Sequence, residues 1–167
     1  YEDKNRWMSY WYQVNEILEF KPENVLIVGK GSGLVSEYFK LSGIETVALD
    51  VDESLKPDVV ASVLDMPFKD NEFDVVLCAQ VLEHLPYENF SKAIIEIKRV
   101  AKKGAVISLP HFGPAIRFLF KAPFLQEIKF MIKLLYPKKH IFKGEHYWEI
   151  GKRGYFLKKI KTEIKKS

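Results

Sequence analysis

The stretch VLIVGKGSG, residues 25–33, decides the fold of this 167-residue chain. Its first four residues are apolar and mostly β-branched, which predicts a short strand buried on both faces of a parallel sheet. Gly29, Gly31 and Gly33 follow at once, and glycine allows a ligand to approach the backbone closely. In open α/β sheets, nucleotides bind at the turn between a strand and the next helix. The stretch therefore predicts a nucleotide-type ligand at this turn.

The spacing of the glycines narrows the ligand class. The dinucleotide fingerprint G-x-G-x-x-G requires glycine at position 34, where this chain has Leu34. The pattern is instead G-x-G-x-G, which alone is a weak signal because turns also use glycine for purely conformational reasons. Other residues of the chain are therefore needed to identify the ligand.

The residues around this stretch predict strands and helices in alternation. Apolar residues at helical spacing predict an amphipathic helix over 6–20, and further helices follow the glycine turn and span 90–100. Short apolar runs predict strands at 25–28, 46–49, 57–61, 73–79 and 105–109. This order indicates a Rossmann-like, doubly wound α/β fold with a mostly parallel sheet and right-handed crossovers.

Length and composition fit one globular domain, with 47% hydrophobic and 29% charged residues. We divide it into an N-terminal helical segment (1–22), a ligand-binding core (23–110), an apolar and basic insert (111–143) and a C-terminal segment (144–167). No apolar run reaches the length of a membrane span, and the first residues do not resemble a signal peptide. Cys78 is the single cysteine, which excludes an intramolecular disulfide and a cysteine metal cluster. We expect a soluble, cytoplasmic protein.

Charge is distributed unevenly along the chain. Residues 1–110 contain 12 Lys and Arg against 18 Asp and Glu, residues 111–143 contain 7 against 1, and residues 144–167 contain 7 against 3. The basic part after residue 110 could attract anions, acidic lipid or nucleic acid, but surface lysines that serve solubility are the favoured explanation.

Two aspartates follow predicted strands near the glycine turn. Asp50 ends the second strand, where its carboxylate could accept two hydrogen bonds from a ribose diol. Asp65, in VLDMPF, could meet an adenine amino group while Met66 packs on the ring. We interpret Asp52 as a surface residue.

Five pieces of the chain together resemble the class I S-adenosylmethionine-dependent methyltransferases of the small type 11 group. They cover about residues 25–110, and the most distinctive is the fourth: VLIVGKGSG, VALDVD, SVLDMPF, FDVVLCAQVLEHLP and AVISLP. The resemblance implies S-adenosylmethionine as cofactor. It places the three glycines under the methionine and ribose, Asp50 on the ribose hydroxyls, Asp65 and Met66 at the adenine, and Gln80 at the methionine end.

The chain departs from the family pattern at two places. Ile27 stands where the family usually has Asp or Glu, so a catalytically silent methyltransferase-like binding module is the alternative to an enzyme. The family also continues with two strands that form an antiparallel hairpin in the sheet. Here the chain ends at Ser167, and we expect that hairpin to be missing.

A methyl acceptor such as a hydroxyl needs a base, and two histidines are candidates. His84 follows the fourth strand in LEHLP, where a structural role is equally compatible, and His111 follows the fifth strand. His140 and His146 flank Glu145, but two histidines without a third spaced ligand are poor support for a metal site. We therefore expect no metal.

The insert is dense in apolar residues with interleaved Lys and Arg. Phe124, Ile128, Met131 and Leu135 share a face if this segment is helical. We expect it to cap the acceptor pocket, where Trp7, Tyr10 and Trp11 of the first helix could also contribute. The alternative is docking of 112–136 on a membrane surface or on a second copy of the chain.

The acceptor is expected to be a small or lipid-like molecule. A nucleic-acid methyltransferase remains a further alternative, and its phosphate contacts would come from the basic part after residue 110: Lys138, Lys139, Lys152, Arg153, Lys158 and Lys159.

Overall fold

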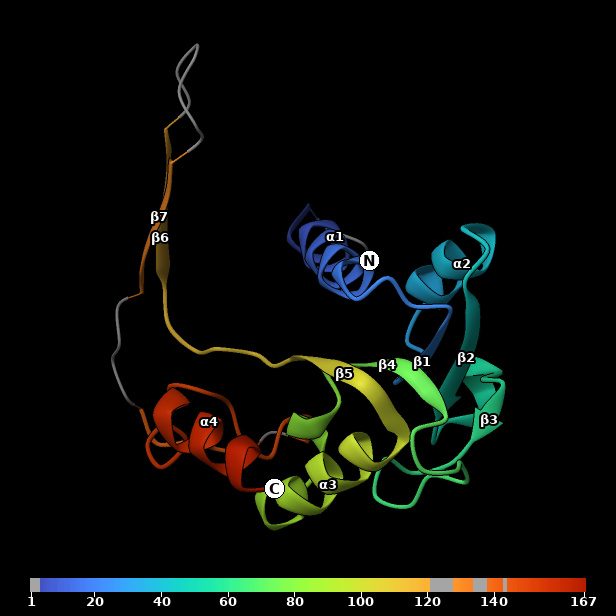
Figure 1. Cartoon of the computed structure of the whole chain (residues 1–167). Coiled ribbons are helices and arrows are strands. Elements are labelled where there is room, and N and C mark those ends of the chain that lie inside the picture. The colour runs from blue at the N-terminus through green and yellow to red at the C-terminus, as the bar shows by residue number, and fades with distance from the viewer. Residues whose placement is uncertain (1–3, 121–127, 134–137, 143) are drawn as a thin grey trace.

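The computed structural model describes residues 4–120, 128–133, 138–142 and 144–167, with the backbone alone at 115–120 and 128–133. Five parallel strands form one sheet in the order β3-β2-β1-β4-β5. Their bounds are β1 (Asn24–Val28), β2 (Glu45–Asp50), β3 (Val59–Val60), β4 (Phe73–Ala79) and β5 (Ala101–Ser108). The predicted Rossmann-like α/β fold is confirmed (Figure 1).

Helices cover both faces of this sheet (Figure 1). One face carries α1 (Lys4–Glu19) and α2 (Leu34–Leu41), and the other carries α3 (Phe90–Val100). The last helix, α4 (Leu157–Lys166), lies beside α3. Three short 3-10 helices lie in the loops: η1 (Glu53–Leu55), η2 (Leu82–His84) and η3 (Tyr87–Asn89). None of the helices in the described part of the chain has the length and apolar character of a membrane span.

Alternate residues of β1 pack into two apolar clusters on opposite faces of the sheet. Val25 and Ile27 belong to the apolar cluster under α1 and α2, whereas Leu26 and Val28 belong to the larger cluster under α3. Side chains of a strand point alternately to opposite faces, so a strand between two helical layers must be apolar throughout. This explains the continuous apolar run in the sequence.

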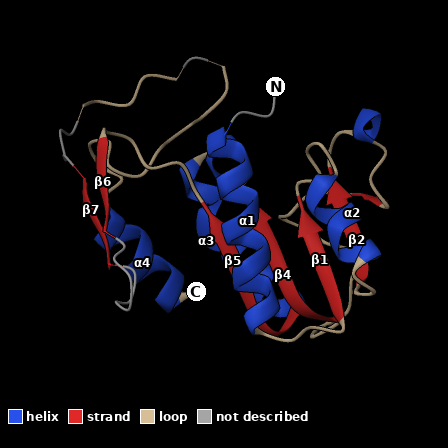
Figure 2. Ribbon diagram, turned by 90° about the horizontal axis from the view of Figure 1, so that it is seen from above, coloured by secondary structure: helices blue, strands red, loops and turns tan. Residues whose placement is uncertain are grey.

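In the described part of the insert, two strands pair as an antiparallel hairpin. β6 (Ala115–Phe120) pairs with β7 (Ile128–Lys133) in a separate two-stranded sheet that projects away from the main sheet (Figures 1 and 2). The predicted helix face is therefore wrong at Ile128 and Met131, which lie on β7, while Phe124 and Leu135 fall outside the described residues. Among the described residues, β6 and β7 form a sheet of their own and do not extend the five-stranded sheet beside β5.

The C-terminal segment packs against the loop after β4. Trp148 is fully buried and donates a hydrogen bond from Nε1 to the carbonyl oxygen of Leu85 at 3.1 Å. The backbone N–H of Tyr147 donates to the carbonyl oxygen of Glu83 at 2.8 Å. Residues more than 60 positions apart in sequence therefore meet beside the carboxyl end of β4.

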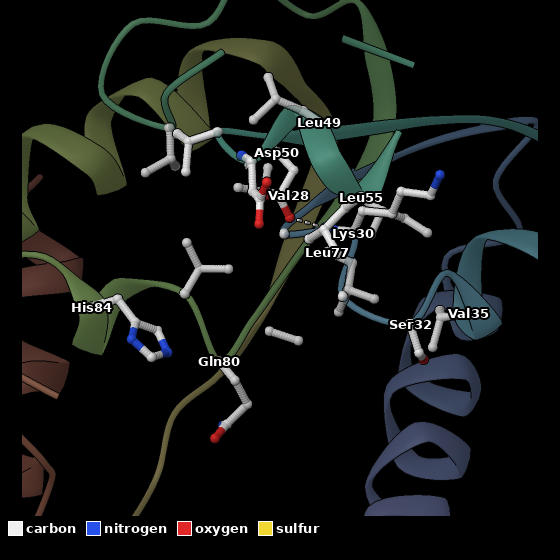
Figure 3. Close-up of a pocket in the computed structure, with 18 of the residues that line it drawn as sticks. Val28, Lys30, Ser32, Val35, Leu49, Asp50, Leu55, Leu77, Gln80 and His84 are labelled. Carbon is white, nitrogen blue, oxygen red and sulfur yellow. Dashed lines mark hydrogen bonds between the residues drawn. The ribbon is translucent and has the colours of Figure 1, made fainter. Parts of the chain in front are cut away.

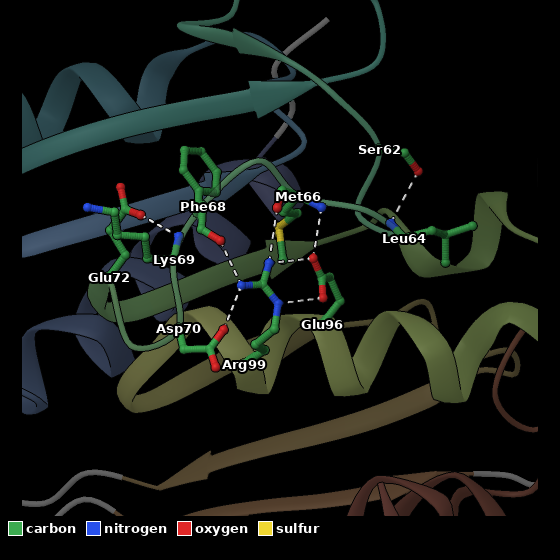
Figure 4. Close-up of polar contacts among 9 residues, drawn as sticks. All are labelled: Ser62, Leu64, Met66, Phe68, Lys69, Asp70, Glu72, Glu96 and Arg99. Atoms are coloured by element: carbon green, nitrogen blue, oxygen red, sulfur yellow. Dashed lines mark hydrogen bonds and ion pairs between the residues drawn. The ribbon is translucent and has the colours of Figure 1, made fainter.

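Arg99 on α3 fixes the loop that leads into β4 (Figure 4). Its guanidinium donates to the carbonyl oxygens of Met66 at 3.0 Å and Phe68 at 2.6 Å, and it pairs with Glu96 at 2.6 Å. Glu96 in turn accepts a hydrogen bond from the backbone N–H of Met66 at 2.8 Å. The hydrogen bond from Arg99 is the main cause that lowers the pKa of Glu96.

Candidate functional site

A pocket of about 620 Å³ opens at the carboxyl ends of β1, β2 and β4 (Figure 3). β1 and β4 are neighbours in the sheet, and the connections from them run in opposite directions, to β2 and to β5. Ligands of open α/β sheets bind at such a switch point. The fold thus places the predicted glycine turn at the edge of the sheet where ligands bind in open α/β folds.

The glycine turn needs glycine for two different reasons. At Gly29 the backbone has φ +85°, and an added Cβ would lie 2.3 Å from Cγ2 of Val81, so a side chain has no room there. At Gly31 the backbone has φ +52°, but an added Cβ would meet nothing within 4 Å. Both line the pocket. Gly29 therefore lets the strand ends pack, whereas Gly31 leaves open space in the pocket.

Gly33 marks the start of the following helix. It has φ +78° and is the N-cap of α2, and no side chain caps the helix at this residue. It is the single glycine of the predicted three that is absent from the pocket lining, which includes its neighbours Ser32 and Leu34.

Asp50 lies at the pocket as predicted (Figure 3). Its Oδ2 accepts a hydrogen bond from the backbone N–H of Lys30 at 2.8 Å, and its Oδ1 accepts one from the backbone N–H of Asp52 at 3.0 Å. Each carboxylate oxygen can accept a second hydrogen bond. Asp50 therefore holds the glycine turn and keeps acceptor capacity for a ligand diol.

The structure does not bring Asp65 and Met66 to this pocket. Met66 is 3% exposed and packs in the core under α3, and Asp65 is exposed beyond a turn that it closes with Ser62. The pocket is lined instead by residues 61–63, which follow β3 directly. The sequence signal for these residues was their position right after the third strand.

The end of β4 contributes Gln80 and His84 to the pocket lining (Figure 3). Gln80 has φ +56°, a backbone conformation that residues other than glycine adopt at a cost. Its backbone N–H donates to the carbonyl oxygen of Ser108 at 2.9 Å, and its Nε2 donates to Oγ of Ser108 at 3.2 Å. β5 thus holds Gln80 at the pocket in this strained conformation.

The two histidines considered as bases lie in different places in the structure. His84 lines the pocket, whereas His111 does not and lies in a β-bridge with Ile150. The ring of His111 lies close to Gly151, where an added Cβ would be 3.0 Å from its Cδ2. Its position places His111 against the C-terminal segment.

One wall of the pocket comes from α1. Arg6, Tyr10 and Gln13 line it, and the hydroxyl of Tyr10 lies 3.3 Å from Oγ of Ser32 in the glycine turn. Trp7 and Trp11 are 51% and 54% exposed and are not part of the lining. Of the three aromatic residues that could contribute to the chamber, Tyr10 lines the pocket.

Ile27 also lines the pocket and is only 4% exposed. The position where the resembling family usually has a carboxylate is therefore apolar and packed among side chains of the α1 and α2 face.

Some of the basic residues considered for nucleic acid, and the two histidines near Glu145, have partners within the chain. Among the basic residues considered for nucleic acid, Lys152 stacks on the ring of Phe112 and Lys159 on the ring of Tyr87, at 4.1 Å and 4.6 Å from the centroids. His140 and His146 are joined through a hydrogen bond of 2.8 Å between Nε2 of His140 and the backbone carbonyl oxygen of His146. The ring of His146 instead lies 4.9 Å from that of His84.

Glu83, which sequence reasoning missed, is fully buried beside these two histidines. Burial raises the pKa of its carboxyl to about 7. The sequence carried no signal for it, because its position in LEHLP identifies neither its burial nor its neighbours.

Comparisons with known proteins agree with this geometry. A family model described as a methyltransferase domain matches residues 26–109. A demethylmenaquinone methyltransferase of Renibacterium salmoninarum is 34% identical over 107 residues, which cover 55% of this chain and 44% of that protein. A ubiquinone biosynthesis O-methyltransferase of Rickettsia bellii is 27% identical over 97 residues, which cover 50% of this chain and 40% of that protein. The chain thus spans less than half the length of these two curated relatives.

A solved structure shows the same architecture. The crystal structure of a putative methyltransferase from Bacillus halodurans is 27% identical and superposes with a TM-score of 0.52, covering 62% of this chain and 52% of that one. The family match, which runs from β1 into the residue after β5, includes the strands that carry the pocket.

Proposed function

Because the chain belongs to the methyltransferase domain family over residues 26–109, we propose that it transfers a methyl group from S-adenosylmethionine to a small or lipid-like acceptor. The observation that carries the proposal is the carboxylate of Asp50 beside the glycine turn in a pocket of about 620 Å³. Pockets for cofactors and small molecules typically measure about 300 to 1,000 Å³.

The residues of the pocket fit this cofactor. The open space at Gly31 would let an adenosyl group approach the backbone, and the remaining acceptor capacity of Asp50 suits a ribose diol. Residues 61–63 would contact the adenine end, because they follow β3 next to Asp50. Arg6 and Gln13 would face the amino-acid end from α1.

S-adenosylmethionine supplies a methyl group on a sulfonium, so transfer requires alignment of an acceptor for in-line displacement. Gln80 is hydrogen-bonded to Ser108 through its backbone and its side chain at the pocket edge, which suits a group that orients one of the two reactants. His84 is the histidine in the lining that can accept or relay a proton from a hydroxyl acceptor. Residues of α1 form one wall of the same space.

The nature of the acceptor is supported by the relatives. Two of them are named for demethylmenaquinone methylation and for ubiquinone biosynthesis, and both names point to ring acceptors with lipid-like tails. The apolar residues that line the pocket, among them Ile27, Val81 and Leu85, suit such an acceptor.

Transfer of a labelled methyl group tests the proposal. The full chain is incubated with S-adenosylmethionine carrying a radioactive methyl group and with the lipid and aqueous fractions of a cell extract. Label is expected in the lipid fraction, and S-adenosylhomocysteine should suppress it.

A catalytically silent binding module is the second candidate, and the buried Ile27 favours it. A silent module would bind S-adenosylmethionine but transfer label to no fraction.

A further inference from the structure

Three potential metal ligands meet beside the cofactor pocket. Glu83 and His84 lie on η2, directly after β4, and His146 lies in the loop that precedes Trp148. One ligand atom from each of the three side chains lies within 4.8 Å of the other two. The hydrogen bond from the backbone N–H of Tyr147 to the carbonyl oxygen of Glu83 holds the two segments together at 2.8 Å.

The carboxylate of Glu83 lacks the partners that its burial demands. The residue is 0% exposed, and neither Oε1 nor Oε2 has a hydrogen-bond partner among the described residues. A carboxylate removed from water is costly unless hydrogen bonds or a cation compensate it. The structure therefore holds an acidic group with both oxygens available in a closed environment.

The imidazole of His84 is oriented as a ligand. Its Nδ1 donates to the backbone carbonyl oxygen of Glu145 at 3.0 Å, since a carbonyl can only accept. The neutral ring then carries its free electron pair on Nε2. Histidines that bind metals usually donate their other ring N–H to a carbonyl or a carboxylate in this way.

His146 is supported in a similar manner. Its Nδ1 lies 3.6 Å from Oε1 of Glu149, and its backbone carbonyl oxygen accepts the hydrogen bond from Nε2 of His140. The carboxylate near Nδ1 favours a proton on that nitrogen, which leaves Nε2 as the atom with a free electron pair.

We propose that Glu83, His84 and His146 bind one divalent transition-metal ion, a function beyond the proposed methyl transfer. One carboxylate and two imidazoles form a donor set used for zinc, iron and related ions, and they leave a further coordination position open. Ligand atoms around tetrahedral zinc lie about 3.3 Å apart at bond lengths of about 2.0 Å, so binding draws the three side chains together by at most about 1.5 Å. His84 lines the cofactor pocket, so the metal lies at its edge. In the metal-bound chain Nε2 of His84 holds the ion and does not accept a proton from the acceptor.

Metal titration of the full chain tests this assignment. The protein, freed of any histidine tag and stripped with a chelator, is titrated with Zn²⁺ against a chromogenic indicator and with Co²⁺ by visible absorption. We expect one ion per chain and a d–d spectrum of tetrahedral or five-coordinate Co²⁺. Glu83→Gln and His146→Gln should each weaken Zn²⁺ binding by about tenfold or more. Replacing a residue that only hydrogen-bonds to a metal ligand already costs about tenfold or more in metal affinity, and replacing the ligand itself should cost at least as much.

His111→Asn is the matched control, because it removes a histidine that is not part of the cluster. It should leave Zn²⁺ affinity unchanged. Glu83 is buried, so His84→Asn at an exposed position provides a variant that preserves the core. It too should lose affinity.

The proposal is overturned if the wild-type chain binds no Zn²⁺, or if the three cluster variants bind it as tightly as the control. Titration with S-adenosylhomocysteine in excess chelator is carried out in parallel. That measurement reports on the methyltransferase pocket alone, so the failure of one proposal is distinguishable from the failure of the other.

Discussion

The Oδ2 of Asp50 accepts a hydrogen bond of 2.8 Å from the backbone N–H of Lys30. This bond joins the end of β2 to the middle of the glycine turn after β1. Asp50 therefore shapes the turn and presents its remaining acceptor capacity to the same pocket. A change at Asp50 should affect ligand binding both directly and through the turn.

Gly31→Ala should weaken cofactor binding more than it weakens folding. The left-handed backbone at this residue costs an alanine about 1 kcal/mol, but no protein atom lies within 4 Å of the added Cβ. The Cβ instead occupies space that the adenosyl group needs, so we expect affinity for S-adenosylhomocysteine to fall by about tenfold or more. Calorimetric titration and urea unfolding measure the two effects.

Gly43→Ala is the control for this variant. Gly43 also has a positive φ, of +78°, and free space around an added Cβ, but it does not line the pocket. Its substitution should destabilise folding by a similar amount and leave affinity unchanged. Equal affinity losses in the two variants would contradict an open cradle at Gly31.

Ala61→Leu should reduce cofactor affinity, whereas Asp65→Asn should not. Ala61 lines the pocket, so a larger side chain there fills space at the predicted adenine end. Asp65 is exposed and outside the lining. Calorimetry on both variants decides between the placement in the structure and the role that the sequence resemblance implies for Asp65. Loss of affinity in Asp65→Asn alone would favour the latter.

Asp74→Asn should lower stability at neutral pH and have a diminishing effect in acid. A hydrogen bond from the backbone N–H of Glu23, followed by one from Lys103, lowers the pKa of the Asp74 carboxyl. A lowered pKa contributes stability above the ordinary value of about 3.9, and this contribution is lost as the pH falls through the lowered pKa. Wild type should exceed the variant by about 1 to 2 kcal/mol at pH 7.

Urea unfolding from pH 7 to pH 3 checks this dependence. Glu37→Gln is the control, because its side chain is 66% exposed on α2. A difference between wild type and Asp74→Asn that stays constant across the whole range would contradict the assignment.

Arg99→Lys should destabilise the protein although it keeps the charge. The guanidinium binds two backbone carbonyl oxygens and Glu96 at once, and a lysine cannot reproduce this fork. We expect a loss of about 2 kcal/mol in the free energy of unfolding. Arg153→Lys, at an exposed position, is the matched control and should change little. Equal stability of both variants would show that the loop before β4 does not depend on Arg99.

The sequence predicted the sheet because its strands carry local signals. The apolar run of β1 and the glycine turn gave both the fold and the position of Asp50. The hairpin was missed because residues 128–133 fit a helical face when their apolar positions are considered alone. The two lysines of this stretch, Lys129 and Lys133, are four residues apart, a spacing that fits a helix and a strand alike, so no local pattern decided between them.

The sequence could predict only those site residues that directly follow a strand in the chain. Residues 61–63 were passed over for Asp65 because an acidic residue is a stronger chemical signal than its distance from the strand end. The meeting of Glu83 with His146 depends on how the C-terminal segment packs against η2, and no local pattern reports such a contact.

Calorimetric titration of the full chain with S-adenosylhomocysteine tests most directly whether the glycine turn and Asp50 hold an adenosyl group. Wild type should bind one molecule per chain, and Asp50→Asn should bind about tenfold or more weakly, since a hydrogen bond to a charged group contributes about 1.5 to 3 kcal/mol. Asp70→Asn, at a side chain that is 72% exposed and outside the pocket, should bind like wild type. Absence of binding by the wild-type chain, or equal binding by Asp50→Asn, would contradict the proposed cofactor site.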